Sequence, residues 1–183
     1  MPNKETYISV DAETAGPNPS QYAMLSIGAC TVDEPVETFY VELQPDREVF
    51  SPEALEVSGL SLEKLQENGV PPEQAMGRFG DWVKQVTPEN SRPVFVAFNA
   101  PFDWMFVNDY FHRYLGYNPF GHSALDMKAF FMGMQGVRWG DTGFEKVTEY
   151  FDIDHPLTHN ALQDALDQAA LFRRMLEEAK KGN

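Results

Sequence analysis

The run Thr6-Tyr-Ile-Ser-Val-Asp11 consists mainly of β-branched and apolar residues and ends in an acid. Such a run is typical of a strand that is largely buried. Two more strands are predicted after it, over residues 23–32 and 36–41, and the connections between the three are short. Strands joined by short connections predict an antiparallel meander. The first strand therefore forms the start of a sheet around which the rest of the chain folds.

Helical signals follow the meander, among them Ser at positions where helices commonly begin. The predicted elements are helices near 51–55, 61–65 and 71–83, a polar loop over 87–92, a strand over 94–98, and helices near 102–115 and 160–179. A meander followed by alternating helix and strand predicts an α/β protein with a mixed sheet flanked by helices.

Length and composition predict one globular domain over residues 1–183, because 43% of the residues are hydrophobic. We expect a cytoplasmic protein with no membrane partner, since no signal segment or spanning run is visible. The net charge is −14, with 14 Lys and Arg against 28 acids. This balance argues against a basic face that grips long duplexes and favours short or single-stranded ends. Metal ions held by carboxylates can supply positive charge locally.

Four acids stand where predicted strands end or helices begin. Asp11 and Glu13 lie two apart at a strand end, so their side chains should point to the same side. Asp103 follows a predicted buried strand and opens a helix, and Asp164 borders the apolar stripe of the last helix. Each acid alone also fits a solvated strand end or a helix-start acid stabilised by the helix dipole. Together they suit hard divalent cations.

His159 precedes Asp164 by five residues, a spacing that would place the two on different faces of an ideal helix. We therefore expect His159 in the segment that leads into the last helix, or in its first turn. From there its imidazole can reach a water molecule at the acidic site and act as a general base. Four carboxylates and one imidazole suit a pair of hard divalent cations and a general base, which together can cut phosphodiesters with water.

Three segments, in this order, resemble the motifs of the DEDDh 3'→5' exonucleases, the proofreading-exonuclease (DnaQ-like) family: Asp11-Ala-Glu-Thr14, Asn99-Ala-Pro-Phe-Asp103 and His159-Asn-Ala-Leu-Gln-Asp164. The similarity runs over nearly the whole chain, and within the family it is strongest to RNase T. It implies a ribonuclease-H-like fold with a mixed five-stranded sheet flanked by helices.

The resemblance also implies two Mg²⁺ or Mn²⁺ ions, held by Asp11, Glu13, Asp103 and Asp164. His159 would take the proton of the attacking water. Nucleoside 5'-monophosphates would then leave the 3' end of single-stranded or short DNA or RNA. The terminal nucleotide would be held by the backbone near Thr14, by Asn99 and by Phe102, and for Phe102 a place in the core is an equal alternative.

This chain departs from the family pattern outside the catalytic positions. Phe98 stands where many members have His, and Pro17, Val57 and His122 replace aromatic residues that RNase T stacks on terminal bases. RNase T is a homodimer in which a basic patch serves the partner's site, but Lys4 is the only cation before the first motif here. A homodimer therefore stays possible but open. Two alternative functions also stay open: a proofreading subunit that acts with a polymerase, and a non-catalytic nucleic-acid-binding module on the same fold.

Overall fold

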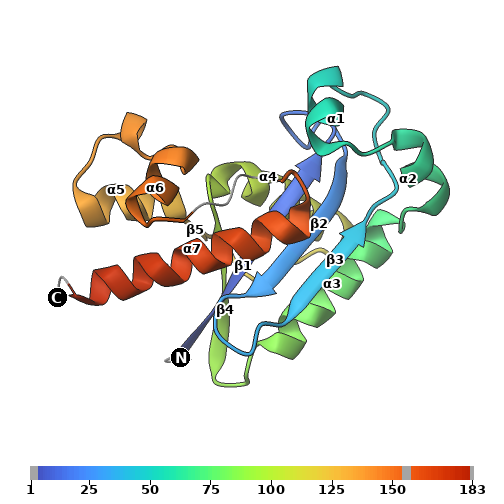
Figure 1. The fold of residues 1–183 in the computed structure, drawn as a ribbon. Coiled ribbons are helices and arrows are strands. Elements are labelled where there is room, and N and C mark those ends of the chain that lie inside the picture. The colour runs from blue at the N-terminus through green and yellow to red at the C-terminus, as the bar shows by residue number, and fades with distance from the viewer. Residues whose placement is uncertain (1–3, 154–157, 182–183) are drawn as a thin grey trace.

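The computed structural model describes residues 4–153 and 158–181. A single five-stranded sheet forms its centre, with the strand order β3-β2-β1-β4-β5 (Figure 1). The strands are β1 (Lys4–Thr14), β2 (Met24–Thr31), β3 (Thr38–Glu42), β4 (Ser91–Ala97) and β5 (Ala124–Asp126). β1, β2 and β3 run antiparallel as a meander, whereas β4 pairs parallel with β1 and with β5. The predicted meander and mixed sheet are confirmed.

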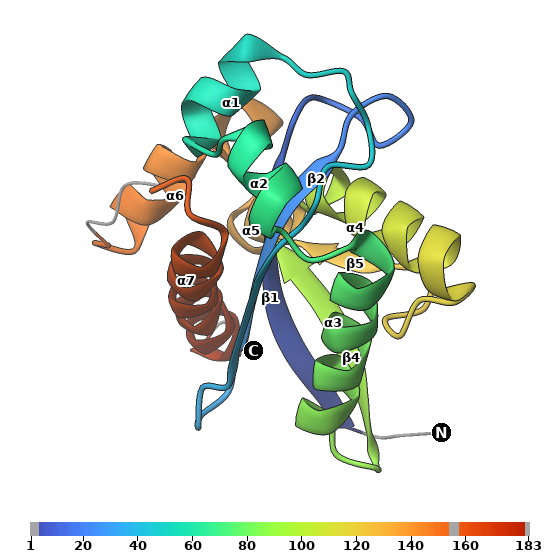
Figure 2. The same cartoon turned by 90° about the vertical axis from the view of Figure 1, so that its right-hand side faces the viewer.

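Helices cover both faces of the sheet, as Figure 2 shows from the side. One face packs against α3 (Pro72–Val86) and α4 (Ala100–Leu115). The other packs against α7 (Ala161–Lys181), with α5 (Met127–Gln135), the 3₁₀ turn η1 (Trp139–Asp141) and α6 (Phe144–Tyr150) beside it. The remaining helices, α1 (Pro52–Ser58) and α2 (Leu62–Asn68), begin at side-chain caps from Ser51 and Ser61, as predicted. Among the described residues, no helix has the length and apolar composition needed to cross a bilayer.

Successive side chains of β1 point to opposite faces of the sheet, so this strand contributes residues both to the core and to the acidic cluster. Ile8, Val10 and Ala12 are buried in the core shared with α3 and α4. Because successive side chains point to opposite faces of a strand, Asp11 and Glu13 face the side on which α7 lies. The strand thus anchors the sheet on one face and presents two carboxylates on the other.

Gly28 on β2 lets α7 begin directly against the sheet. It lies opposite Asp11 in the antiparallel register. A Cβ atom at this position would lie 2.1 Å from the carbonyl carbon of Ala161, the first residue of α7. The absent side chain therefore allows the helix that carries Asp164 to approach the strand that carries Asp11.

The structure differs from the predictions at β4, which begins at Ser91 and not at Val94. The predicted loop over 87–92 is shorter because β1 begins early and its Lys4 pairs with Ser91. Pro93 is tolerated there because β5 pairs with β4 only from Phe95 onward, so Pro93 lies on an unpaired edge. No elements were predicted from the residues over 116–153, where β5, α5 and α6 lie.

Candidate active site

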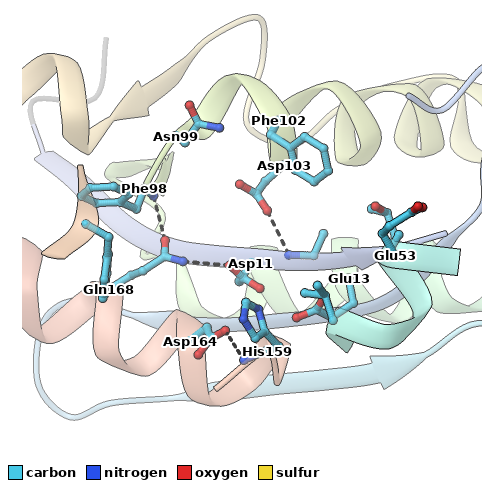
Figure 3. A pocket seen from close by; sticks show the side chains of 15 residues that line it. Asp11, Glu13, Glu53, Phe98, Asn99, Phe102, Asp103, His159, Asp164 and Gln168 are labelled. Atoms are coloured by element: carbon cyan, nitrogen blue, oxygen red, sulfur yellow. Dashed lines mark hydrogen bonds between the residues drawn. The ribbon is translucent and has the colours of Figure 1, made fainter. Parts of the chain in front are cut away.

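A cleft of about 390 Å³ opens at the end of β1, where the starts of α4 and α7 meet it (Figure 3). The residues that line it are Asp11, Ala12, Glu13, Thr14, Glu53, Ala54, Val57, Phe98, Asn99, Phe102, Asp103, Phe144, His159, Asp164 and Gln168. Every residue that the sequence analysis assigned to the site is therefore found in this one cleft. Segments more than 150 residues apart meet there, as the hydrogen bond between Asp11 and Gln168 demonstrates.

Asp11 and Glu13 project into the cleft from the same side of β1, as their spacing predicted. The carboxylate of Asp11 is fixed on one side, because its Oδ1 accepts a hydrogen bond of 2.8 Å from Nε2 of Gln168 on α7. Glu13 lies two residues closer to the end of β1, opposite Ser26 of β2. The two carboxylates therefore line the same cleft at neighbouring positions along β1.

Asp103 reaches the site from the first turn of α4 and is only 5% exposed. Its Oδ1 accepts a hydrogen bond of 3.0 Å from the backbone N–H of Ala12. The last residue of β1 that pairs with β4 is Ser9, so the N–H of Ala12 lies beyond that ladder and Asp103 supplies its acceptor. The bond joins the start of α4 to β1 beside Asp11.

The start of α4 is held in place by a carboxylate from the neighbouring strand. Asn99 precedes the helix in the left-handed conformation, with φ of 67°. The backbone N–H groups of Asn99 and Ala100 donate to Oδ1 of Asp126, at 3.1 and 3.2 Å. An acid at a helix N-terminus offsets the positive end of the helix dipole. Asp126, at the end of β5, thus fixes the turn from which Asp103 projects.

Asp164 binds the segment that leads into α7 and so fixes the backbone of His159. Its Oδ1 accepts from the backbone N–H and the hydroxyl of Thr158 at 2.8 and 2.9 Å, and its Oδ2 accepts from the N–H of His159 at 2.9 Å. The sequence analysis placed Asp164 beside a core face, and it is only 3% exposed. These three donors give the buried carboxylate of Asp164 hydrogen-bond partners within the chain. Its burial alone therefore does not require a metal ion.

His159 lies in the segment before α7 and not in its first turn, since the helix begins at Ala161. Its backbone adopts the left-handed conformation, with φ of 55°. A ligand atom from each of Glu13, His159 and Asp164 lies within 4.8 Å of the other two. The imidazole is exposed to solvent while it faces two carboxylates (Figure 3).

Burial and mutual repulsion raise the pKa values of Asp11, Glu13 and Asp103. Burial, followed by the charges of Asp103, Glu13 and Asp164, raises the pKa of Asp11 well above its usual range. Burial raises the pKa of Asp103 to about 8, against the opposing effect of the N–H of Ala12. Burial also raises the pKa of Glu13. A divalent cation among these oxygens would remove the repulsion, and carboxylate oxygens are the donors that Mg²⁺ and Mn²⁺ prefer.

The residues expected near the terminal nucleotide differ in how freely they reach the cleft. Thr14 is buried, and its hydroxyl donates to the carbonyl of Gly16 at 2.9 Å. Asn99 is exposed. Phe102 is half-buried: it packs against the main core cluster beside Phe106 and also lines the cleft. Phe102 is therefore partly a core residue and partly exposed to the cleft, where a terminal base would lie.

The sequence analysis assigned no site role to several residues that line the cleft, chiefly Gln168. It lies one helical turn after Asp164 and is only 2% exposed. A polar residue four positions after a functional acid, within an apolar stripe, was the available signal. Phe98 and Phe144 form a second feature, with ring centroids 5.0 Å apart and an interplanar angle of 84°. Of the described residues that line the cleft, none is Lys or Arg.

Comparisons with known proteins identify the family of this chain. The family model of RNase T-type proteins, described as Exonuclease, matches residues 8–172. The 3'-5' DNA exonuclease Cap18 of Escherichia coli is 48% identical over 181 residues, which cover 98% of this chain and 97% of that protein.

Two solved structures share the fold. The nuclease domain of 3'hExo, a DEDDh family member, bound to rAMP, aligns with a TM-score of 0.81 at 16% identity, over 96% of this chain and 94% of that one. E. coli exonuclease I in complex with a dT13 oligonucleotide aligns with a TM-score of 0.74 at 19% identity, over 97% of this chain. The present chain covers only 42% of the exonuclease I chain. By its match to the family model and to a relative of similar length, the chain belongs to the exonuclease family of RNase T-type proteins.

Proposed function

We propose that residues 1–183 act as one exonuclease domain that removes nucleotides from the 3' end of single-stranded DNA and releases nucleoside 5'-monophosphates. The observation that carries this proposal is the convergence of Asp11, Glu13, Asp103, Asp164 and His159 in one open cleft. The cut requires a water nucleophile, a group to accept its proton and positive charge at the phosphate. Solvent supplies the water, His159 would accept its proton, and the cations that the four acids attract would supply the positive charge.

The four acids are proposed to hold two Mg²⁺ or Mn²⁺ ions. When bound, such ions lower the pKa of water and offset the charge that develops on the phosphate oxygens. The protein's own contribution is to fix the oxygens in advance: Gln168 orients Asp11, Ala12 orients Asp103, and Thr158 and His159 orient Asp164. Such outer hydrogen bonds hold metal ligands in a productive orientation.

His159 is proposed as the general base. Its imidazole is close to Glu13 and Asp164 and is also exposed, so it can accept a proton inside the cleft and release it to solvent. The bond from its backbone N–H to Asp164 couples the position of the base to that of a carboxylate. The same closeness would let His159 bind a cation directly. A base role predicts loss of turnover without loss of metal binding, and a ligand role predicts both losses.

The cleft supports a single-stranded end as the substrate. Its wall offers the rings of Phe98, Phe102 and Phe144, and unpaired bases stack on aromatic rings. A chain with a net charge of −14 and no Lys or Arg in the described lining is poorly suited to hold a long duplex. Similarity to a protein named as a DNA exonuclease supports DNA over RNA.

The direct test compares linear and circular single strands of one sequence, as DNA and as RNA, in Mg²⁺, Mn²⁺ or EDTA. We expect loss of the linear DNA in either metal, mononucleotide 5'-phosphates as the product, and an intact circle. Faster loss of linear RNA would contradict the DNA assignment alone. Cleavage of the circle would contradict exonuclease action, and unchanged cleavage in EDTA would contradict the metal-dependent mechanism.

A further inference from the structure

Gln168 joins three parts of the site through a single side chain. It lies on α7, one turn after Asp164, and is only 2% exposed. Its Nε2 donates to Oδ1 of Asp11 at 2.8 Å, and its Oε1 accepts from the backbone N–H of Phe98 at 2.8 Å. The amide therefore bridges β1 and the end of β4, as Figure 3 shows.

The orientation of this amide is determined by its partners. A backbone N–H can only donate, so the N–H of Phe98 requires the oxygen of Gln168 to face it. The NH₂ group is then directed at Asp11, whose ionised carboxylate can only accept. A flipped amide would set donor against donor and acceptor against acceptor. Gln168 therefore presents a fixed donor to one particular oxygen of Asp11.

This donor acts where the acidic cluster is most crowded. Asp11 lies in one cleft with Asp103, Glu13 and Asp164. The bond from Gln168 engages Oδ1 of Asp11. It also fixes the direction of Oδ2 by fixing the carboxylate plane. A carboxylate that is already oriented has less to rearrange when a cation binds.

We propose that Gln168 is a positioning residue that holds the Asp11 carboxylate ready to bind the divalent cation. The inference rests on the proposed function, since it concerns the same cluster of acids. It assigns a role to a residue outside the three motifs, and it makes the end of β4 part of the site's support through the N–H of Phe98.

The test replaces Gln168 by Met, which has similar length and no amide, and by Asn, whose shorter side chain cannot span both partners. The matched control is Gln163→Met, on the same helix but exposed, where the side chain bonds only to Asp167 at 3.0 Å. Each protein is titrated with Mn²⁺ by calorimetry in the absence of nucleic acid. Its kcat and KM are then measured on linear single-stranded DNA, and its folding is checked by thermal unfolding.

Both Gln168 variants should bind Mn²⁺ about 10-fold more weakly and lose about 10- to 100-fold in kcat, as is typical when outer-shell partners of metal ligands are removed. KM for DNA should stay close to that of the Gln163→Met control, because Gln168 is proposed to act through Asp11 and not on the substrate. If Gln168→Met fails to fold, Gln168→Asn decides the question.

Folded Gln168 variants with control-like Mn²⁺ affinity and kcat would overturn the inference while leaving the exonuclease proposal intact. A wild-type protein that does not shorten DNA would instead contradict the proposed function itself. A fall in kcat with a matching rise in KM and unchanged Mn²⁺ binding would assign Gln168 to the substrate side and also overturn the inference.

Discussion

Asp103 is almost entirely removed from water, and the backbone N–H of Ala12 donates to it at 3.0 Å. Burial raises its pKa from 3.8 to about 8. Between those values the folded chain holds a proton that the unfolded chain has released, so without metal the free energy of unfolding should fall as pH rises. Asp103→Asn keeps an oxygen for Ala12 and cannot ionise, so this contribution to the pH dependence should disappear.

Thermal unfolding in EDTA between pH 5 and pH 8, which lies within the interval from the unfolded pKa of 3.8 to the folded pKa of about 8, provides the measurement. The melting temperature of the wild type should fall relative to that of Asp103→Asn as pH rises. Asp81→Asn, an exposed position on α3, is the control and should follow the wild type. Parallel curves for wild type and Asp103→Asn would mean that the buried carboxyl group ionises at no cost.

His159 offers the clearest separation between chemistry and binding. His159→Ala removes the proposed proton acceptor but leaves the backbone N–H that donates to Asp164. We expect kcat to fall about 10²- to 10⁴-fold, the usual contribution of a general base. Metal affinity and KM should change little. His112→Ala, at an exposed position on α4, is the matched control. A large loss of metal affinity in His159→Ala would make the imidazole a ligand.

At the scale of elements, the site depends on how closely α7 approaches β2. A Cβ at Gly28 would lie 2.1 Å from the backbone of Ala161, and backbone atoms cannot move aside as a flexible side chain can. Gly28→Ala should therefore push the start of α7 outward. We expect a loss of about 1–3 kcal/mol in the free energy of unfolding, typical of overpacking. Activity should fall more sharply, because Asp164 and His159 move with the helix.

Gly77→Ala is the counterpart on α3, where a Cβ would meet nothing within 4 Å. It should raise stability by up to about 1 kcal/mol, since Ala favours the helix interior, and should leave activity unchanged. Chemical denaturation and initial rates on single-stranded DNA measure both effects. Wild-type stability and rate in Gly28→Ala would show that α7 can shift without disturbing the acids.

The predictions from sequence succeeded for elements with a clear composition, a helical period or a Ser cap, and failed for elements with none of these. β1 and α7 were recognised, the first by its β-branched and apolar residues and the second by its apolar stripe, although β1 extends beyond the predicted residues. β5 has only three residues, and α6 has seven and follows Gly143 without a side-chain cap. The start of β4 was predicted at residue 94, but the strand begins at Ser91 because Ser91 pairs with Lys4 of β1. A local sequence pattern does not show which strand will pair with another.

Candidate site residues could be named from the sequence where they belong to local sequence patterns. The acids and His159 occur in ordered local patterns that resemble a known family, so they could be named before their positions in space were known. Gln168 belongs to no such pattern. Its role depends on contacts with Asp11 and Phe98, which lie 157 and 70 residues away in the chain. Such supporting residues emerge only when the segments are brought together.

At the scale of the whole molecule, the protein has a net charge of −14, and its proposed substrate, DNA, is also strongly negative. The acids that create part of this charge are gathered in one cleft, where divalent cations would reverse the local sign. A net negative charge disfavours binding along long nucleic acids and so favours an end that can enter the cleft. Charge and site together therefore favour a nuclease that works on free ends.

The most direct measurement follows a 5'-labelled single-stranded DNA oligonucleotide in Mg²⁺, with the wild type, Asp11→Asn and the exposed control Asp81→Asn. The wild type and the control should give a ladder that shortens from the 3' end, and EDTA should abolish it. Asp11→Asn should give no ladder, because it removes a carboxylate from the centre of the cluster. Wild-type shortening by Asp11→Asn, or label released first as a 5' mononucleotide, would contradict the assignment of this cleft to 3'→5' hydrolysis.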